Sequence, residues 1–152
     1  MADEKQLATT NARAGVIHLE VVTPTGRAVS TDVDQVEAPS VQGEFGVLPG
    51  HLPLLAALKS GVVRYRRAGK SFALAVGPGF AEAGADVMSI LTDRCVDAAD
   101  VVVADARKAL DEATRKLDAY TGPVDSAEHE ELARAVDWFQ AQVDAVAEVG
   151  RA

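Results

Sequence analysis

The sequence predicts an α+β protein in which an N-terminal antiparallel β sandwich of about ten strands is followed by a C-terminal antiparallel two-helix hairpin. Short apolar segments separated by turn residues run from Val16 to Cys95, a pattern typical of sandwiches and barrels. Beyond Cys95 the apolar residues recur with a helical period. We therefore divide the chain into a flexible tail at 1–15, a β-sandwich domain at 16–96 and a helical hairpin at 97–152.

The charge and composition of the chain exclude several classes of protein. The net charge of −8 argues against a nucleic-acid-binding protein. Residues 1–96 hold 10 acidic and 9 basic side chains and residues 97–152 hold 13 and 6, which supports a boundary near residue 97. No segment reaches the roughly 18 apolar residues of a membrane-spanning helix, and we expect no secretory signal at 1–15. The single cysteine is typical of a reducing compartment.

Alternation of apolar with other residues predicts the strands. Ile17, Leu19 and Val21 form one apolar face of the first strand, because successive side chains of a strand point to opposite sides. Pro39 is expected to end the strand before it, because proline cannot donate to a sheet ladder. The apolar segment 54–58 is expected to be a buried strand. The predicted strands are 16–22, 28–30, 33–38, 54–58, 62–67, 71–76, 80–83 and 87–91.

The stretch 43–53 interrupts these strands with three glycines and two prolines. Glycine serves where φ must be positive, and Pro49 and Pro53 argue against a regular central strand. We therefore expect a short strand, a sharp turn and a second short strand, with Glu44 and His51 held beside rigid turns. Loops that a rigid scaffold holds in place often carry function.

Two helices are predicted after residue 97. Asp97 or Asp100 can cap the first, and Gly122 with Pro123 ends it. The second begins with the capping-box pattern at 125–128. Because two helices that bury only each other are marginally stable, we expect the hairpin also to pack on the β domain or on another protein. The apolar stripe of the first helix is Val102, Ala106, Ala109, Ala113, Leu117 and Tyr120, and that of the second is Leu132, Val136, Phe139, Val143 and Val146.

The residues that could carry chemistry do not form a complete catalytic set in the sequence. Glu44 and His51 could act as an acid–base pair, but no third group is evident that would orient the base. Cys95 with His51 as a nucleophile pair is weaker, because a structural thiol is commoner. No His, Cys or Asp cluster has metal-ligand spacing. We expect His51 to be a turn residue bonded to backbone.

Two further features have a structural and a functional interpretation. The segment 77–80 is Gly-Pro-Gly-Phe, which lacks the third glycine and the following helix of a phosphate loop, so its glycines are expected to serve turns. A group of basic residues gathers on one hairpin, and either blunts a solvated sheet edge or forms a docking patch for an acidic partner. These residues are Arg64, Arg66, Arg67 and Lys70.

Two parts of the chain also resemble a known family. Residues 43–54 are Gly-Glu-Phe-Gly-Val-Leu-Pro-Gly-His-Leu-Pro-Leu and residues 58–63 are Leu-Lys-Ser-Gly-Val-Val, and both strongly resemble the signature of the epsilon subunit of F-type ATP synthases. Residues 77–82 and 87–93 resemble its second conserved block. The likeness runs from about Val16 to the end of the chain; it is specific in the β domain and architectural in the helices.

The resemblance implies a non-catalytic rotor subunit of the central stalk. In this family the β sandwich docks on the gamma subunit and on the polar loops of the membrane c-ring, and thereby helps to couple proton translocation to ATP synthesis in the catalytic head. Glu44 matches a position expected near the c-ring loops, and Val47 and His51 are expected at the same foot of the rotor. The protein would then lie, as a peripheral subunit, on the cytoplasmic face of the bacterial inner membrane.

The resemblance also implies a regulatory hairpin. Folded on the sandwich it permits activity, and extended along gamma toward the alpha and beta subunits it inhibits ATP hydrolysis. Asp100 matches the acid of an Ile-Asp-x-x-Arg-Ala motif with which some bacterial members bind ATP, but Val103 replaces the arginine. Because a natural phosphate partner is lost, we expect no tightly bound ATP, and we expect no other cofactor or metal. Arg107 and Arg115 could serve the extended, inhibitory state, although the hairpin is acidic overall.

Two functions of other classes stay open at this point. One is a free nucleotide-sensing module whose hairpin closes on ATP, which the valine at position 103 argues against. The other is a small hydrolase that uses Glu44 and His51. Calorimetry with ATP would test the first, and the activity of His51→Ala would test the second.

Overall fold

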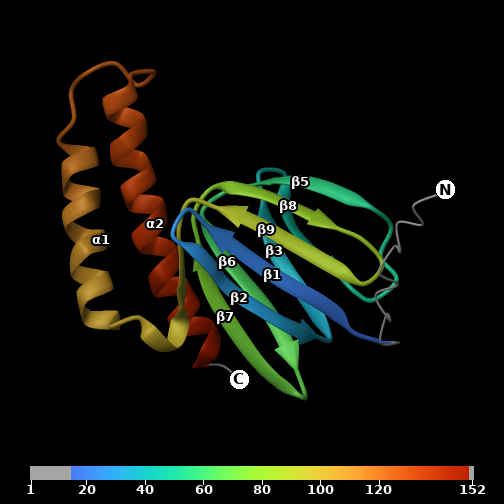
Figure 1. The fold of residues 1–152 in the computed structure, drawn as a ribbon. Helices are drawn as coiled ribbons and strands as arrows, with labels where there is room; N and C mark the ends of the chain where they lie inside the picture. The colour runs from blue at the N-terminus through green and yellow to red at the C-terminus, as the bar shows by residue number, and fades with distance from the viewer. Residues whose placement is uncertain (1–14, 151–152) are drawn as a thin grey trace.

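The computed structural model describes residues 15–150, so the tail predicted at 1–15 lies outside the described residues except for Gly15. Ten strands are followed by a helical hairpin that stands at one side of the sandwich (Figure 1), which confirms the predicted α+β architecture. The strands are β1 (Ile17–Thr23), β2 (Gly26–Val33), β3 (Gln35–Ser40), β4 (Gly43–Val47), β5 (Leu54–Leu58), β6 (Gly61–Arg67), β7 (Lys70–Val76), β8 (Gly79–Ala83), β9 (Val87–Thr92) and β10 (Cys95–Asp97). The helices are the short 3-10 helix η1 (Ala98–Asp100), α1 (Val103–Asp118) and α2 (Ala127–Val149).

The strands form one hydrogen-bonded sheet that folds over into a sandwich. Their order is β10-β7-β6-β3-β5-β8-β9-β1-β2, and β4 pairs with β3. Every pair on this path is antiparallel except β1 with β9, which run parallel. The predicted antiparallel sandwich is therefore confirmed, with this one parallel pair as an exception. The β1–β2 and β8–β9 hairpins lie side by side, and the strands that meet there run in the same direction.

Branched apolar side chains fill the space inside the sandwich. Ile17, Leu19 and Val21 of β1 are fully buried, as the alternation in the sequence predicts. Met88 and Ile90 of β9 are buried beside them. Burial of such side chains stabilises a fold by roughly 1.5–3 kcal/mol each. The core also contains Val33, Val36, Val47, Leu58, Val63, Leu74 and Val76.

Pro39 lies inside β3, so the prediction that it ends the strand is wrong. The register explains why a proline fits there. β3 pairs with β6 as far as Glu37 and with β5 only from Ser40, so the missing N–H falls where the strand changes partner. The carbonyl of Pro39 still accepts the Lys59 N–H at 3.1 Å. The loss of one donor is therefore tolerated.

Strand β5 is also not the buried strand that its composition predicts. Leu55 is 72% exposed, whereas Leu58 is buried. The outer side of this part of the sandwich is open, so alternate residues of β5 face outward. The apolar run in the sequence therefore marks a strand with two apolar faces, only one of which is covered within the described chain.

The hairpin packs on the sandwich through α2, while α1 packs on the far side of α2 (Figure 1). Ala141 and Ala145 of α2 lie against Ala73 and Ala75 of β7 in a second apolar cluster, which also contains Val62, Ala98, Val96 and Trp138. The hairpin was expected to pack on the β domain or on another protein, and in the structure it packs on the β domain. We call this contact between α2 and the outer face of β6 and β7 the hairpin seam.

The caps of the helices differ from the prediction by a few residues. Asp97 caps η1 by accepting the Ala99 N–H at 2.9 Å, and neither it nor Asp100 caps α1, which begins after Val102 without a side-chain cap. Ser126 rather than Asp125 caps α2 and accepts the His129 N–H at 3.1 Å. The capping pattern predicted at 125–128 therefore does lie at the start of α2, and its second residue is the cap.

Candidate partner-binding surfaces

The turn at residues 48–51 is rigid for reasons that the sequence makes clear. The His51 N–H donates to the Leu48 carbonyl at 3.1 Å, which closes a four-residue turn. Pro49 occupies its second position, and Gly50 has a φ of +85° in its third, the arrangement typical of a type II turn. The Gly50 N–H donates to the Ala85 carbonyl at 2.6 Å. The turn is thus pinned to the loop between β8 and β9.

His51 and Val47, two of the residues expected to bind a partner, have mainly local contacts. The His51 ring nitrogen Nδ1 lies 2.6 Å from the Leu52 carbonyl oxygen, which agrees with a turn residue bonded to backbone. Val47 is fully buried in the sandwich core. Its side chain is therefore not available to a partner in this conformation, and the expectation of a direct contact is not supported.

Glu44 lies on the surface and is paired within the protein. Its Oε1 accepts a hydrogen bond from Arg64 Nη1 at 2.7 Å. Glu44 sits near the start of β4, whereas His51 lies beyond the other end of that strand. The structure does not bring these two side chains together as an acid–base pair, since each has a different partner.

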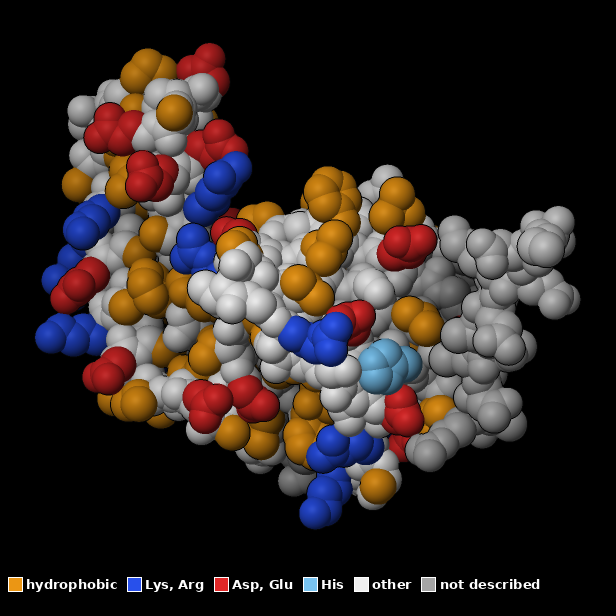
Figure 2. Space-filling view, in the orientation of Figure 1, with side chains coloured by type: hydrophobic (Ala, Val, Ile, Leu, Met, Phe, Trp, Pro, Cys, Tyr) orange, Lys and Arg blue, Asp and Glu red, His pale blue; other side chains and the backbone are white. Residues whose placement is uncertain are grey.

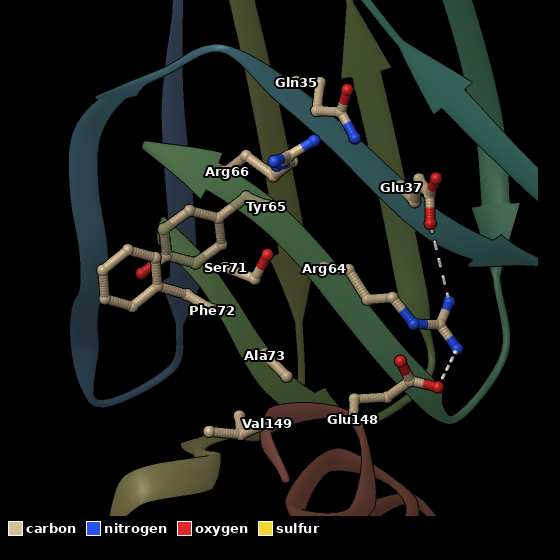
Figure 3. A pocket seen from close by; sticks show the side chains of 10 residues that line it. All are labelled: Gln35, Glu37, Arg64, Tyr65, Arg66, Ser71, Phe72, Ala73, Glu148 and Val149. Carbon is tan, nitrogen blue, oxygen red and sulfur yellow. Dashed lines mark hydrogen bonds and ion pairs between the residues drawn. The ribbon is translucent and has the colours of Figure 1, made fainter. Parts of the chain in front are cut away.

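Arg64 connects three parts of the molecule. Besides Glu44, its Nη2 donates to Glu148 Oε1 in the last turn of α2 at 3.0 Å, and Nη1 lies 3.8 Å from Glu37 Oε2 of β3. Figure 3 shows the guanidinium between Glu37 and Glu148. The hydrogen bond with Glu148 raises the pKa of Arg64 further above its ordinary value, against the opposing effect of burial. We call Arg64 with these three carboxylates the Arg64 junction.

The four basic residues around the β6–β7 hairpin do not act as one patch. Arg64 is committed to the junction, and Arg67 lies over the Phe72 ring, 5.1 Å from its centroid, and donates to Thr31 Oγ1 at 2.9 Å. Phe72 itself stacks on Tyr65. The interpretation as a charge-blunted sheet surface fits these contacts better than a single docking patch for an acidic partner.

An exposed apolar surface forms a further candidate site, which the motifs of the sequence do not indicate. Phe80 of β8 is 58% exposed and Leu91 of β9 is 56% exposed, and the register places these residues opposite each other. Ala57 of β5 and Val22 of β1 flank them in the same row. Apolar side chains are visible across the upper part of the β domain in Figure 2. We call the row of Val22, Leu91, Phe80 and Ala57, with the neighbouring Leu55, the outer apolar face.

The signal for this surface was present in the sequence. In β8 the buried residues Ala81 and Ala83 alternate with Phe80, so a large aromatic side chain had to point outward. Gly79 lets the strands approach closely, because a Cβ there would overlap the Leu91 carbonyl oxygen. Monomeric proteins seldom expose large connected apolar surfaces, so such a surface indicates a binding site.

The hairpin residues expected to take part in regulation are all on the surface. Asp100 is the exposed last residue of η1, and Arg107 and Arg115 are exposed on α1. Val103, which replaces the arginine of the ATP-binding motif, is the first residue of α1. In the folded hairpin the three charged side chains are therefore open to solvent.

Two groups that could suggest catalysis, the Cys95 thiol and a Ser-His-Asp set, have structural explanations. Burial raises the pKa of the Cys95 thiol to about 11, with a smaller effect of Asp97, so Cys95 is a poor nucleophile at neutral pH. Ser30 Oγ lies 3.2 Å from His18 Nε2, and His18 Nδ1 lies 2.9 Å from Asp32. This is the order of a hydrolase triad, but the three side chains form cross-strand pairs on the exposed surface of β1 and β2 rather than in a water-excluded site.

The described part of the chain adds two negative findings. Among residues 15–150, no group of three or more His, Cys, Asp or Glu side chains is arranged to hold a metal ion. Within the same range, no helix is both long enough and apolar enough to cross a membrane. The features that the structure does show are surfaces: a pinned turn, an outer apolar face and a hairpin docked beside a charged junction. A connected exposed apolar surface of this kind is typical of the class of proteins that bind other proteins.

Comparison with known proteins identifies the family. Residues 16–98 match the family model described as ATP synthase, Delta/Epsilon chain, beta-sandwich domain. The chain is 41% identical over 111 residues to the ATP synthase epsilon chain of Nitratidesulfovibrio vulgaris strain DP4, covering 73% of this chain and 83% of that one. It is 40% identical over 130 residues to the ATP synthase epsilon chain of Magnetococcus marinus, covering 86% and 93%.

A solved structure agrees with the fold. A chain in the structure of the Euglena gracilis mitochondrial ATP synthase, described as OSCP/F1/c-ring in rotational state 1, aligns with a TM-score of 0.72 and 22% identity over 100% of this chain and 91% of that one. The chain belongs to the delta/epsilon family of ATP synthase subunits. It is an epsilon-type, non-catalytic subunit of an F-type ATP synthase, as the signature at 43–54 predicted.

Proposed function

We propose that the protein, as the epsilon subunit in the central stalk of the ATP synthase, docks on the gamma subunit through its outer apolar face and on the c-ring loops through the turn at 48–53. In this position it helps to couple proton translocation to ATP synthesis in the catalytic head. The observation that carries the proposal is the outer apolar face, because its connected apolar side chains have no cover within the described chain.

The turn supports the second contact. Leu52 is 80% exposed at its tip and Leu48 is also exposed, and the hydrogen bond from Gly50 to Ala85 holds the turn against the sandwich. A loop that transmits torque has to be stiff, and the turn geometry provides that stiffness. We also propose that Glu44 and His51 contact the c-ring loops. Glu44 would then bind both the partner and Arg64.

The hairpin at 97–152 is proposed as a regulatory unit distinct from the β domain at 16–96. In the extended position it would reach the alpha and beta subunits and reduce ATP hydrolysis, with Asp100, Arg107 and Arg115 on its exposed side. The alanines of the seam favour such a release, because each of them loses little buried apolar surface when α2 leaves. We place the whole subunit at the cytoplasmic face of the bacterial inner membrane, held there by its partners.

Removal of the outer apolar face tests the proposal. The double substitution Phe80→Ser with Leu91→Ser should reduce the gamma subunit that a tagged chain retains from its native membranes by tenfold or more, because exposed aromatic anchors often dominate an interface. The control is Val124→Ser, which removes an exposed apolar side chain from the loop between α1 and α2.

Both variants should fold normally, because the replaced side chains are exposed, and their unfolding midpoints check this. Undiminished retention of gamma by the folded double variant would exclude the outer apolar face as the docking surface. Equal loss of gamma in the double variant and in Val124→Ser would point to a nonspecific effect and would likewise contradict the proposal.

A further inference from the structure

The Arg64 junction connects two surfaces that the proposed function uses for different purposes. One nitrogen of the guanidinium is bonded to Glu44 on the β4 surface, and the other is bonded to Glu148 at the end of the hairpin. Arg64 and Glu148 are 84 positions apart in the sequence. Both side chains are only partly exposed, at 28% and 30%, so their attraction is screened less than that of a surface pair.

The junction matters because the rest of the seam is weak. The apolar part of the seam consists mainly of alanine side chains from α2, β7 and η1, which bury little surface each. At the C-terminal end of α2, around Glu148, the seam is not closely packed. Two cavities of about 250 and 320 Å³ open here, and Arg64 and Glu148 line both of them. This end of the hairpin is therefore held to the sandwich chiefly by polar contacts.

The three carboxylates compete for one cation. Glu37, Glu44 and Glu148 all approach the guanidinium of Arg64, so they share its charge and, being of like charge, repel one another. If the charge of Glu44 is neutralised, that repulsion falls and the donors of Arg64 become available to Glu148. The interaction between Arg64 and Glu148 should then become stronger, because opposite charges at this distance attract by an amount that depends on their neighbours.

We propose that Arg64 is a positioning residue that couples the β4 surface to the hairpin, so that a basic partner side chain bound to Glu44 strengthens the docking of α2. The coupling is reciprocal, because a docked hairpin must favour the same partner to the same degree. The identity of the basic partner rests on the proposed function, in which Glu44 faces a neighbouring subunit. The coupling itself belongs to the isolated chain and can be measured there.

A thiol placed in the seam measures how often the hairpin opens. Ala145 is fully buried at the seam, so the cysteine introduced by Ala145→Cys reacts with a thiol reagent only when α2 lifts off. Cys95→Ser in the same full-length chain removes the single native thiol. The labelling rate then follows the opening equilibrium, provided that closing is faster than the reaction.

In this background, Glu148→Gln should increase the labelling rate about three- to fivefold, which corresponds to the loss of one partly exposed ion pair. Glu44→Gln should decrease the rate by about two- to threefold, the opposite sign, because it leaves Arg64 to Glu148. Glu130→Gln is the matched control, since Glu130 lies on the same helix and pairs with Arg134 one turn away; it should leave the rate unchanged.

The opposite signs distinguish coupling from a purely structural role. An increased or unchanged rate for Glu44→Gln would mean that Glu44 merely supports Arg64 or does not affect it, and either result would overturn the proposal. The Glu44→Gln effect should also disappear in an Arg64→Gln background, as a double-mutant cycle requires. Because no partner is present, these results do not depend on whether the outer apolar face binds gamma. If Arg64→Gln does not fold, the opposite signs of the Glu44→Gln and Glu148→Gln effects still test the coupling.

Discussion

The two buried regions of this protein are built from different side chains. The core of the sandwich contains large branched residues such as Leu19, Ile90 and Leu74, each of them almost wholly buried. The hairpin seam is equally dry at its centre, where Ala145 and Ala75 are fully buried, but it consists mostly of alanines. Equal burial therefore does not mean equal stabilisation, because the free energy depends on how much apolar area each side chain removes from water.

The difference assigns separate tasks to the two regions. Many branched side chains from all parts of the sheet make the sandwich a single stable unit, as a subunit that withstands torque requires. The seam combines small apolar contacts with polar links, which are the Arg64 junction at one end and the Arg94 guanidinium over the Trp138 ring, 5.2 Å from its centroid, further along α2. We therefore expect that α2 can leave the sandwich without unfolding it, which the predictions below test.

The largest effect is expected from a cavity in the sandwich core. Leu19→Ala should lower the free energy of unfolding by about 2–5 kcal/mol, because the lost methyl groups leave a void that the rigid sheet fills poorly. Chemical denaturation followed by circular dichroism measures this. Leu55→Ala is the control, since its side chain is 72% exposed, and it should change the free energy of unfolding by less than about 0.5 kcal/mol. Equal losses of unfolding free energy in the two variants would contradict the assignment of Leu19 to the core and of Leu55 to the exposed side of the sandwich.

A larger side chain in the seam should separate the hairpin from the sandwich. Ala145→Leu adds three carbon atoms between α2 and β7 and should weaken docking by about 1–3 kcal/mol. Trp138, the single tryptophan of the chain, packs at the seam and reports undocking through its fluorescence. The unfolding of the sandwich should be almost unchanged.

The control for this variant is the same replacement on the exposed side of the hairpin. Ala104 lies exposed on α1, so Ala104→Leu changes the helix propensity in the same way but not the seam. It should leave the Trp138 fluorescence unchanged. A loss of sandwich stability in Ala145→Leu as large as that in Leu19→Ala would show that seam and core form one cooperative unit, contrary to the comparison above.

The sandwich could be predicted from the sequence because its signals are local. Alternation in β1 specifies which side chains are buried, and the Pro49–Gly50 pair specifies the turn. The seam could not be predicted from the sequence, for a physical reason. The apolar stripe predicted for α2 is not the side of the helix that packs on the sandwich. That side is formed by Trp138, Ala141, Ala145 and Glu148. Alanines give a weak hydrophobic signal, so this side of α2 is not evident from periodicity.

The candidate site was predicted only in part, for a related reason. The motif singles out Glu44, but its partner Arg64 lies 20 positions away and Glu148 lies 84 positions from Arg64. No local pattern connects residues so far apart, and only the packing of α2 on β6 brings them together. In the same way Val47 belongs to a motif with surface residues, yet the pleat of β4 turns it into the core.

The smallest effect should be confined to the start of α2, far from both buried regions. Ser126 accepts the His129 N–H at 3.1 Å and lies 2.6 Å from the Tyr120 hydroxyl, so its side chain also joins the ends of the two helices. Ser126→Ala should lower the stability of the hairpin by about 1 kcal/mol, the usual effect of a lost N-cap. Hydrogen exchange in the first turn of α2 should become faster, while exchange in β1 and β9 stays unchanged. Asp125→Ala, at the position that the sequence pattern favoured as the cap, is the control and should have a much smaller effect. If Asp125→Ala had the larger effect, the sequence would have located the cap better than the structure does.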